Sequence, residues 1–436
     1  MIALQKDLVV LFWPKQAPLR FAHSSGALAL DQVSRDAMRN VFDGIGERLT
    51  VLQLMPRIEA GGAESAALGA AEAVALAGGR SIVAAAGGPI ERLKRIGAEF
   101  AEAPLDARGP VAIGRNGFRI KRLIDEYQVD IVHARTREIA WAARQATKGS
   151  RAILFTTCGG DAPFNNAGKD AGALGEGDYI IAGSEHVRGL LIDDDSARDG
   201  KVFVIPDGAN LAVYAAEAVG PDRLITLARA WGMLEKPGPM ILVPGPTVPQ
   251  RGKHILARAL GEIANAPGHS DLVAIIQGEL KPKDTYAQQL AWIARKRGTA
   301  GRIFLAGALT DIPAAMMLAD IVISVPVEPL GQDPIAAMAA GLGKPVIGAD
   351  IGATAEVVVD GVTGKLVQPD DPKALGRAVT EILAASGKGK ADLSAAARTW
   401  ALAKFSSTGS ALAVIRLYAE LMKTAKMNLA LTINRD

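Results

Sequence analysis

The sequence is poor in residues that several common functions need. Its 436 residues contain one cysteine, Cys158, so an intramolecular disulfide is impossible and a cluster of thiolate metal ligands is excluded. Such sparing use of cysteine fits a reducing cytoplasm. The 5 histidines include no pair at a metal-ligand spacing such as HxxxH, and we therefore expect no zinc site.

Charge of one sign and long apolar runs are also scarce. Lysine and arginine number 49 against 46 acidic residues, which leaves a formal charge of +3. This excess is far below the concentrated basic surface that nucleic-acid binding requires, so a nucleic-acid partner is disfavoured. The apolar run at 8–13 (LVVLFW) is too short to span a bilayer and ends at Pro14. We expect a protein that is neither exported nor membrane-spanning.

Motifs of three enzyme classes are missing. The phosphate fingerprint GxGxxG does not occur, which counts against a nicotinamide oxidoreductase. The segment from Gly245 to Gly252 has the wrong spacing for a P-loop, and Lys253 is followed by His254 rather than Ser or Thr. GxSxG is absent too, so the nucleophile elbow of a hydrolase is not indicated.

What the sequence does have is a regular alternation of short apolar runs with helical segments. It begins at Leu49 with LTVLQLM, continues through SIVAAA and VDIVHA, and starts again at Met240 with MILVPG. Strands that alternate with helices predict a parallel sheet covered on both faces. Because the series occurs twice, we predict an α/β protein with two Rossmann-like, doubly wound domains. Such domains bind ligands at the carboxyl ends of their strands, across the cleft between them.

The same pattern predicts the domain boundaries. Residues 1–48 hold one apolar run and a polar, loosely helical stretch, and they form an N-terminal extension or an extra edge unit. Residues 49–213 form the first domain and residues 214–404 the second. The segment 405–436 has apolar residues at three- and four-residue spacing, typical of an amphipathic helix. We expect this helix to pack back toward the first domain.

Two segments have a local chemistry suited to a phosphorylated sugar ligand. In GGAE (61–64), after a predicted strand, Gly61 and Gly62 allow a ligand to approach the backbone, and the following helix start offers N–H groups to an anion. In EPLG (328–331), after the strand DIVISV, the Glu328 carboxylate can accept hydrogen bonds from sugar hydroxyls. The alternatives are an ordinary tight turn at the glycines and a solvated loop acid at Glu328.

These segments occur in order with DIVHARTREIAW, VIPDGANLAVY, IPAAMMLAD and AEVVVDGVTGKLVQPDDPKAL. Together they resemble the retaining, nucleotide-sugar-dependent glycosyltransferases of the GT-B fold, in the family-four group. The resemblance implies a donor domain in the second half and an acceptor domain in the first. It implies transfer from a nucleoside-diphosphate sugar to a glycan or lipid-linked acceptor, as in polysaccharide or lipopolysaccharide biosynthesis. It implies no metal and no other cofactor.

The resemblance also assigns roles to positions of this sequence. Glu328 contacts the donor sugar, and Arg251, at the place of a family lysine, pairs with the donor diphosphate; these two are the catalytic candidates. For Glu356, beside the nucleotide in the family, an ordinary structural role is the alternative. The full set of donor-binding candidates is Gly61, Gly62, Gly245, Arg251, Gly278, Glu328, Gly331 and Glu356.

Three positions depart from the family pattern. Pro246 stands where the family has an arginine, Gly159 lies near the place of a histidine, and Ala336 replaces the second carboxylate, which grips the ribose. Loss of a charged hydrogen bond at such a place costs on the order of 1.5 to 3 kcal/mol. The alternative function is therefore a catalytically impaired or inactive GT-B homologue that binds a sugar nucleotide, a glycan or a protein partner.

The sequence predicts a helix from Phe118 to Tyr127. A basic run at this helix has two interpretations. It comprises Arg115, Arg119, Lys121 and Arg122, and such a run is usually a solvated helix face. Because enzymes of this type often meet lipid-linked acceptors, the run also fits peripheral contact with an anionic membrane surface. We expect a cytoplasmic protein, and the second interpretation places it at the inner face of the membrane.

Overall fold

The computed structural model describes most of the chain. The described residues are 32–43, 45, 48–58, 62–107, 109–159, 175–193, 197–235, 238–264, 270–278 and 285–433. The apolar run predicted at 8–13 and the candidate Gly61 lie outside these ranges.

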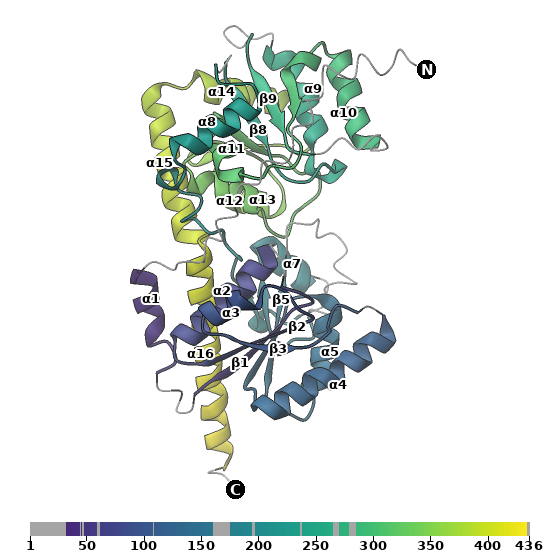
Figure 1. Cartoon of the computed structure of the whole chain (residues 1–436), viewed down its shortest axis with the longest axis vertical. Coiled ribbons are helices and arrows are strands. Elements are labelled where there is room, and N and C mark those ends of the chain that lie inside the picture. The colour runs from purple at the N-terminus through teal and green to yellow at the C-terminus, as the bar shows by residue number, and fades with distance from the viewer. Residues whose placement is uncertain are drawn as a thin grey trace. The chain divides into compact units, whose positions relative to one another are not determined.

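The described chain forms two compact units (Figure 1). The C-terminal unit consists of Ala209–Lys404. The N-terminal unit consists of the described residues up to Gly208, beginning with the helix α1 (Gln32–Arg39), together with the residues from Phe405 onward. Each unit has its own sheet and its own hydrophobic core.

The N-terminal unit is built on a parallel sheet. Within the described residues its strands are β1 (Thr50–Leu54), β2 (Arg80–Ala85), β3 (Glu99–Glu102), β4 (Ile131–Ala134), β5 (Ile153–Cys158), β6 (Tyr179–Ala182) and β7 (Val202–Val204). Their order across the sheet is β3-β2-β1-β4-β5-β6-β7. The central strands are buried along their whole length, because helices cover both faces and no polar face alternates with an apolar one.

One face of this sheet is covered by α4 (Pro110–Tyr127), α5 (Arg137–Thr147) and α7 (Glu185–Asp193). Leu52 of β1 points to this side and shares a core with Ile120 of α4 and Ile139 of α5. α4 begins well before its predicted start at Phe118. Pro110 suits the first turn, because the N–H that proline lacks has no partner within the helix there.

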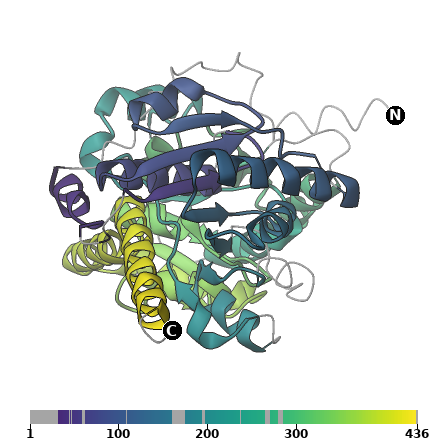
Figure 2. The same ribbon diagram turned by 90° about the horizontal axis from the view of Figure 1, so that it is seen from below.

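The opposite face is covered by α1, α2 (Gly62–Leu76), α3 (Ile90–Arg95) and α16 (Ser407–Ile433). Val51, next to Leu52 in β1, points to this side, as the alternation of a strand requires. The helix predicted within 405–436 is α16, and it packs against α2 and α1 (Figure 2). The last part of the chain thereby completes the core of the N-terminal unit.

A buried polar cluster connects α16 to the sheet. The Tyr418 hydroxyl lies 2.6 Å from Nδ1 of His133 in β4, and it accepts a hydrogen bond of 3.2 Å from Nε2 of Gln53 in β1. Nε2 of His133 lies 2.7 Å from the Thr157 hydroxyl. Burial, and to a smaller extent Arg135, lowers the pKa of His133 well below its usual range, so the ring is neutral at neutral pH. His133 is thus a hydrogen-bonded structural histidine.

The C-terminal unit has a second parallel sheet. Within the described residues its strands are β8 (Met240–Val243), β9 (Val273–Ile276), β10 (Ile303–Leu305), β11 (Ile321–Ser324), β12 (Val346–Ala349) and β13 (Gly364–Val367), in the order β10-β9-β8-β11-β12-β13. Its helices are α8 (Pro221–Ala230), α9 (Lys253–Ala264), α10 (Thr285–Lys296), α11 (Ile312–Leu318), α12 (Pro334–Gly341), α13 (Gly352–Val357), α14 (Pro372–Ala384) and α15 (Gly387–Lys404).

The predicted fold class is confirmed, because each unit holds a doubly wound parallel sheet with helices on both faces. β3 was not among the predicted strands. This strand lies at the edge of its sheet, and Glu99 and Glu102 at its two ends are exposed. It therefore lacks the apolar run by which the other strands are recognised.

Candidate functional site

β8 and β11 lie side by side in the C-terminal sheet, although β9 and β10 separate them in the chain. The strand order reverses at this pair, and open parallel sheets bind ligands at such a point, beyond the carboxyl ends of the strands. Arg251 follows β8 and Glu328 follows β11. The fold therefore brings two candidates from separate motifs to the same edge of one sheet.

The loop after β8 is attached to the end of β9. The Gly245 amide donates to Oε1 of Gln277 at 2.8 Å, and the Thr247 hydroxyl donates to the Gln277 carbonyl at 2.9 Å. Gly245 and Gly278 have φ angles of 88° and 144°, which glycine adopts without strain. A Cβ at Gly278 would lie 1.5 Å from Oγ1 of Thr247, so packing alone requires glycine there.

Arg251 lies where this loop meets the loop after β11. The Gln250 carbonyl accepts a hydrogen bond of 3.0 Å from the Val327 amide. At Gly252 φ is 67°, and a Cβ would lie 1.8 Å from the Val325 carbonyl oxygen, so the two backbones touch with no room for a side chain. Arg251, between these two contacts, is only 7% exposed. Its side chain is held within the junction rather than in bulk solvent.

Lys253, the first residue of α9, was not among the predicted site residues. It is fully buried, and its Nζ donates hydrogen bonds to the carbonyls of Gly245, at 2.7 Å, and of Gln277. Burial first, and repulsion by Arg251 second, lower the pKa of Lys253 to about 7. The sequence offers one signal for it, a second cation two residues after Arg251, but the run matches no phosphate-binding motif.

Asp333 is the second site residue that the sequence analysis missed. Its carboxylate accepts hydrogen bonds from the Ser324 hydroxyl at 2.7 Å, the Thr354 hydroxyl at 2.8 Å and the Ala336 amide at 3.1 Å. The last bond caps α12, and Pro334 is the first residue of that helix. An Asp-Pro pair before an apolar run is the available sequence signal. One buried carboxylate thus joins β11, α12 and α13.

The two positions of the acidic motif have different surroundings. Glu328 is half-buried in the loop after β11, and Leu330 and Gly331 that follow are buried. Ala336 is fully buried in the first turn of α12, where its amide donates a hydrogen bond to the Asp333 carboxylate. Its methyl group contacts protein, so position 336 offers no carboxylate to a ligand.

The loop after β12 completes this edge of the sheet. Gly352, with a φ of 54°, begins α13, and a Cβ there would lie 2.9 Å from both the amide nitrogen and the carbonyl oxygen of Leu330. The Ala353 amide donates to that carbonyl at 3.0 Å. Four loops are thereby connected, and they carry five of the remaining donor-binding candidates: Gly245, Arg251, Gly278, Glu328 and Gly331. The sixth, Glu356, is half-buried in α13.

The N-terminal unit has predicted positions at the carboxyl ends of its own strands. Gly62 is the first residue of α2, which follows β1. Gly159, with a φ of 153°, follows β5. Cys158 is the last residue of β5, and its side chain is buried.

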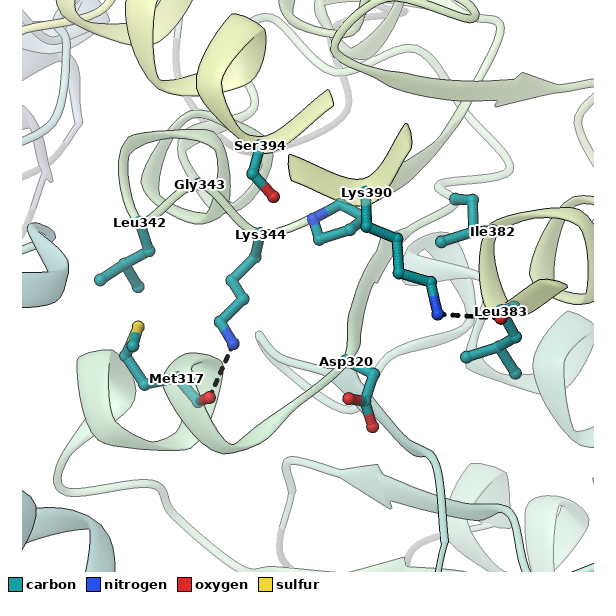
Figure 3. Close-up of a pocket in the computed structure, with 10 residues that line it drawn as sticks. Met317, Asp320, Leu342, Gly343, Lys344, Ile382, Leu383, Lys390 and Ser394 are labelled. Atoms are coloured by element: carbon teal, nitrogen blue, oxygen red, sulfur yellow. Dashed lines mark hydrogen bonds between the residues drawn. The ribbon is translucent and has the colours of Figure 1, made fainter. Parts of the chain in front are cut away.

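A cavity of about 240 Å³ lies at the opposite edge of the C-terminal sheet (Figure 3). Asp320, just before β11, lines it. Nζ of Lys344 donates to the Met317 carbonyl at 2.7 Å, and Nζ of Lys390 donates to the Leu383 carbonyl at 2.9 Å. These two lysines bind the last turns of α11 and α14, so the cavity is distinct from the donor-site loops.

Comparison with protein families agrees with this geometry. Residues 238–385 match the family described as Glycosyl transferases group 1, and residues 60–213 match Glycosyltransferase Family 4. The chain belongs to these glycosyltransferases. The matched ranges cover most of both sheets, including the loops of Arg251 and Glu328.

Relatives and solved structures support the assignment. The chain is 26% identical over 302 residues to the GDP-mannose-dependent alpha-(1-6)-phosphatidylinositol monomannoside mannosyltransferase of Mycolicibacterium smegmatis. This match covers 65% of the chain and 75% of that protein. Matches to several other curated relatives span 45% to 58% of those proteins' length.

Two solved structures share the GT-B fold with this chain. A glycosyltransferase from Rickettsia africae superposes with a TM-score of 0.75 at 22% identity, over 86% of this chain and 99% of the other. Anabaena HepE in complex with UDP superposes with a TM-score of 0.70 at 20% identity, over 86% of this chain and 100% of the other.

Proposed function

We propose that this chain is a retaining glycosyltransferase that moves a sugar from a nucleoside-diphosphate sugar to a glycan or lipid-linked acceptor. The observation that carries the proposal is the connected edge of the C-terminal sheet, where Arg251 and Glu328 follow two adjacent strands. The GDP-mannose and the phosphatidylinositol mannoside in the name of the Mycolicibacterium smegmatis relative support this class of donor and acceptor. So does the UDP in the HepE structure.

In this proposal the C-terminal unit binds the donor. The bond between the anomeric carbon and the diphosphate oxygen breaks, and its electron pair stays on the diphosphate. The Arg251 guanidinium stabilises the charge that develops there, while Glu328 accepts hydrogen bonds from the sugar hydroxyls and orients the ring. The acceptor oxygen bonds to the anomeric carbon and passes its proton to an oxygen of the departing diphosphate, with the acceptor held by the N-terminal unit. Side-chain cations and helix termini stabilise the leaving group without a metal.

Replacing Glu328 by Ala is expected to lower kcat/KM for transfer by about tenfold to a hundredfold, because a charged hydrogen bond to the sugar is lost. The measurement is the release of GDP or UDP from GDP-mannose and UDP-glucose, with the product identified by mass spectrometry. Glu262→Ala, which removes an exposed acid on α9 of the same unit, is the matched control and keeps the wild-type rate. An unchanged rate in Glu328→Ala would contradict the role of this carboxylate.

The competing function is binding without turnover. Pro246 offers neither a charge nor an N–H after β8, and Ala336 buries a methyl group at the second position of the acidic motif. Both changes weaken the hold on a donor. Saturable calorimetric binding of GDP-mannose or UDP-glucose, with no product detected by mass spectrometry, would favour this function and overturn the enzymatic one.

We also propose that the N-terminal unit makes peripheral contact with an anionic membrane surface through α4, on the cytoplasmic side. Val111 and Phe118 on this helix are 75% and 83% exposed. Arg115 and Arg122 are exposed on the same face, since the four positions follow the helical repeat, and neither guanidinium has a partner within the described ranges. No described helix is both long and apolar enough to cross a membrane. Exposed apolar groups between cations suit an interfacial helix.

Binding to lipid vesicles tests this contact. The double variant Arg115→Gln, Arg122→Gln is expected to lower the partition coefficient onto phosphatidylglycerol-containing vesicles by about tenfold or more, because each basic residue near an anionic surface contributes about 1 kcal/mol. Co-sedimentation measures the partition. Trp292→Ser, which removes an aromatic ring 54% exposed on α10, is the control. Equal wild-type binding to pure phosphatidylcholine vesicles would argue against the contact.

A further inference from the structure

Lys253 is a buried ammonium group whose hydrogen bonds all go to uncharged acceptors. Its exposed fraction is 0%, and Nζ donates to the carbonyls of Gly245 and Gln277, with Oγ1 of Thr247 at 3.4 Å. Among the described residues no carboxylate bonds to Nζ. Carbonyl dipoles replace only part of the hydration of a cation, so this burial is costly without a counter-charge.

The charged groups around Lys253 add to this cost. Arg251, two residues earlier, repels the ammonium, and it too is largely buried. From α10 the Tyr286 hydroxyl lies 2.9 Å from Nδ1 of His254, and from the loop before α14 the Asp370 carboxylate lies 3.8 Å from Nε2 of His254. Asp370 also lies 3.5 Å from Arg258, so Tyr286 and Asp370 are engaged by other groups and give Lys253 no compensating negative charge.

A negative charge bound on the loop from Gly245 to Gly252 would offset this cost. Nζ of Lys253 contacts the inner side of that loop, at the carbonyl just before Pro246. Position 246 is where the family pattern has an arginine directed at the donor diphosphate. We infer that Lys253 supplies, from beneath this loop, the second positive charge of the donor-diphosphate site, in place of the arginine that Pro246 replaces.

This inference rests on the proposed function and names a further residue of the same site. Lys253 touches no substrate atom, because the loop backbone lies between. It acts in two ways, by holding the loop to the end of β9 and by its electrostatic field, which is strong in the low-dielectric interior. It is therefore a positioning residue, and its charge state should govern the affinity for a diphosphate.

Linkage gives the sign of the pH dependence. A bound diphosphate favours the charged ammonium and raises the pKa of Lys253 above its free value of about 7. Binding then takes up a proton, so the affinity is highest below that pH and falls as the pH rises toward the pKa of the complex. The terminal phosphate of GDP or UDP has lost its second proton above about pH 6, so the titration of these two ligands lies below this window. Pyrophosphate loses its last proton within the window, so for this probe the contribution of Lys253 is the difference between the wild-type and Lys253→Met pH profiles.

The experiment is calorimetric titration of the full chain with GDP, UDP and inorganic pyrophosphate between about pH 7 and pH 9. We expect the wild-type Kd to rise about tenfold across this range. Titrations at about pH 8 in two buffers of different ionisation enthalpy should reveal proton uptake on binding. This measurement needs no variant.

Variants then assign the effect to one residue. Lys253→Met is expected to bind about tenfold more weakly at neutral pH, with a Kd that no longer changes with pH. Adding Pro246→Arg to Lys253→Met should restore affinity across the range, since arginine stays charged. Lys344→Met is the matched control, because this half-buried lysine also binds backbone carbonyls in the C-terminal unit but lies at the other edge of the sheet. The Lys344→Met variant should keep the wild-type dependence of Kd on pH.

The outcomes separate this inference from the proposed function. Nucleotide binding with no proton uptake and a constant Kd overturns the role of Lys253 and leaves the function standing. Pyrophosphate binding with the Lys253 pH profile, but no binding of GDP or UDP, supports the anion site and overturns the nucleotide-sugar function. Absence of binding by all three probes overturns both.

Discussion

Replacing Asp333 by Ala is expected to destabilise the C-terminal unit by about 3 to 5 kcal/mol. The substitution leaves the hydroxyls of Ser324 and Thr354 without their acceptor in a buried site, and it removes the N-terminal cap of α12. It also disconnects β11 from α13, so the loop that carries Glu328 loses its support. We therefore expect binding of GDP-mannose or UDP-glucose to be lost together with the stability.

Native-state hydrogen exchange read by mass spectrometry measures this effect, because it reports the free energy of opening for each unit separately. A single unfolding transition is not a safe measure in a protein with two units. Asp371→Ala is the matched control. Asp371 caps α14 by accepting hydrogen bonds from the amides of Lys373 and Ala374. These hydrogen bonds are more exposed than those of Asp333, so Asp371→Ala should lower the free energy of opening by only about 1 kcal/mol. If both variants lowered the free energy of opening by the same amount, Asp333 would be only a helix cap.

Replacing Tyr418 by Phe is expected to destabilise the N-terminal unit by about 2 to 4 kcal/mol, although it removes a single oxygen atom. The phenylalanine ring can keep its edge contact with Phe155, whose centroid lies 4.8 Å away. What is lost is the hydroxyl shared by His133 and Gln53. Both groups are fully buried, and neither gains water in exchange. The free energy of opening should fall in β1, β4 and α16 together.

Tyr179→Phe provides the control for this second variant. Tyr179 belongs to the same aromatic cluster, with its ring 5.5 Å from that of Phe155, and within the described residues its hydroxyl has no hydrogen-bond partner. Its loss should change the opening free energy by less than about 0.5 kcal/mol. Similar exchange rates in the Tyr418→Phe and wild-type proteins would mean that packing alone fastens α16 to the sheet.

The strands of both sheets other than β3 could be predicted, because a strand buried on both faces must be apolar along its length. LTVLQLM and MILVPG are marked in this way, and they form β1 and β8. The start of α4 was predicted too late, since Pro110 and the exposed Val111 precede the clearly periodic part of the helix.

The motifs indicated the residues that are predicted to face a ligand, but not those that support them. Glu328 and Arg251 stand in recognisable runs, and their shared location follows from the strand order of the sheet. Asp333 and Lys253 have no motif of their own. The side-chain partners of Asp333 lie 9 and 21 residues away, and the carbonyls that accept from Lys253 lie 8 and 24 residues away. No local pattern records such contacts.

The sequence by itself determined the family, the two doubly wound sheets and the loops on which a donor site can form, because periodicity and glycine placement are local properties. Only the tertiary structure decided the electrostatics of that site. A lysine two residues after an arginine is expected to be solvated, yet Lys253 is fully buried and Arg251 nearly so. Burial depends on elements far apart in the chain, here the ends of β8, β9 and β11. It is burial that lowers the pKa of Lys253 and makes its charge responsive to an anion.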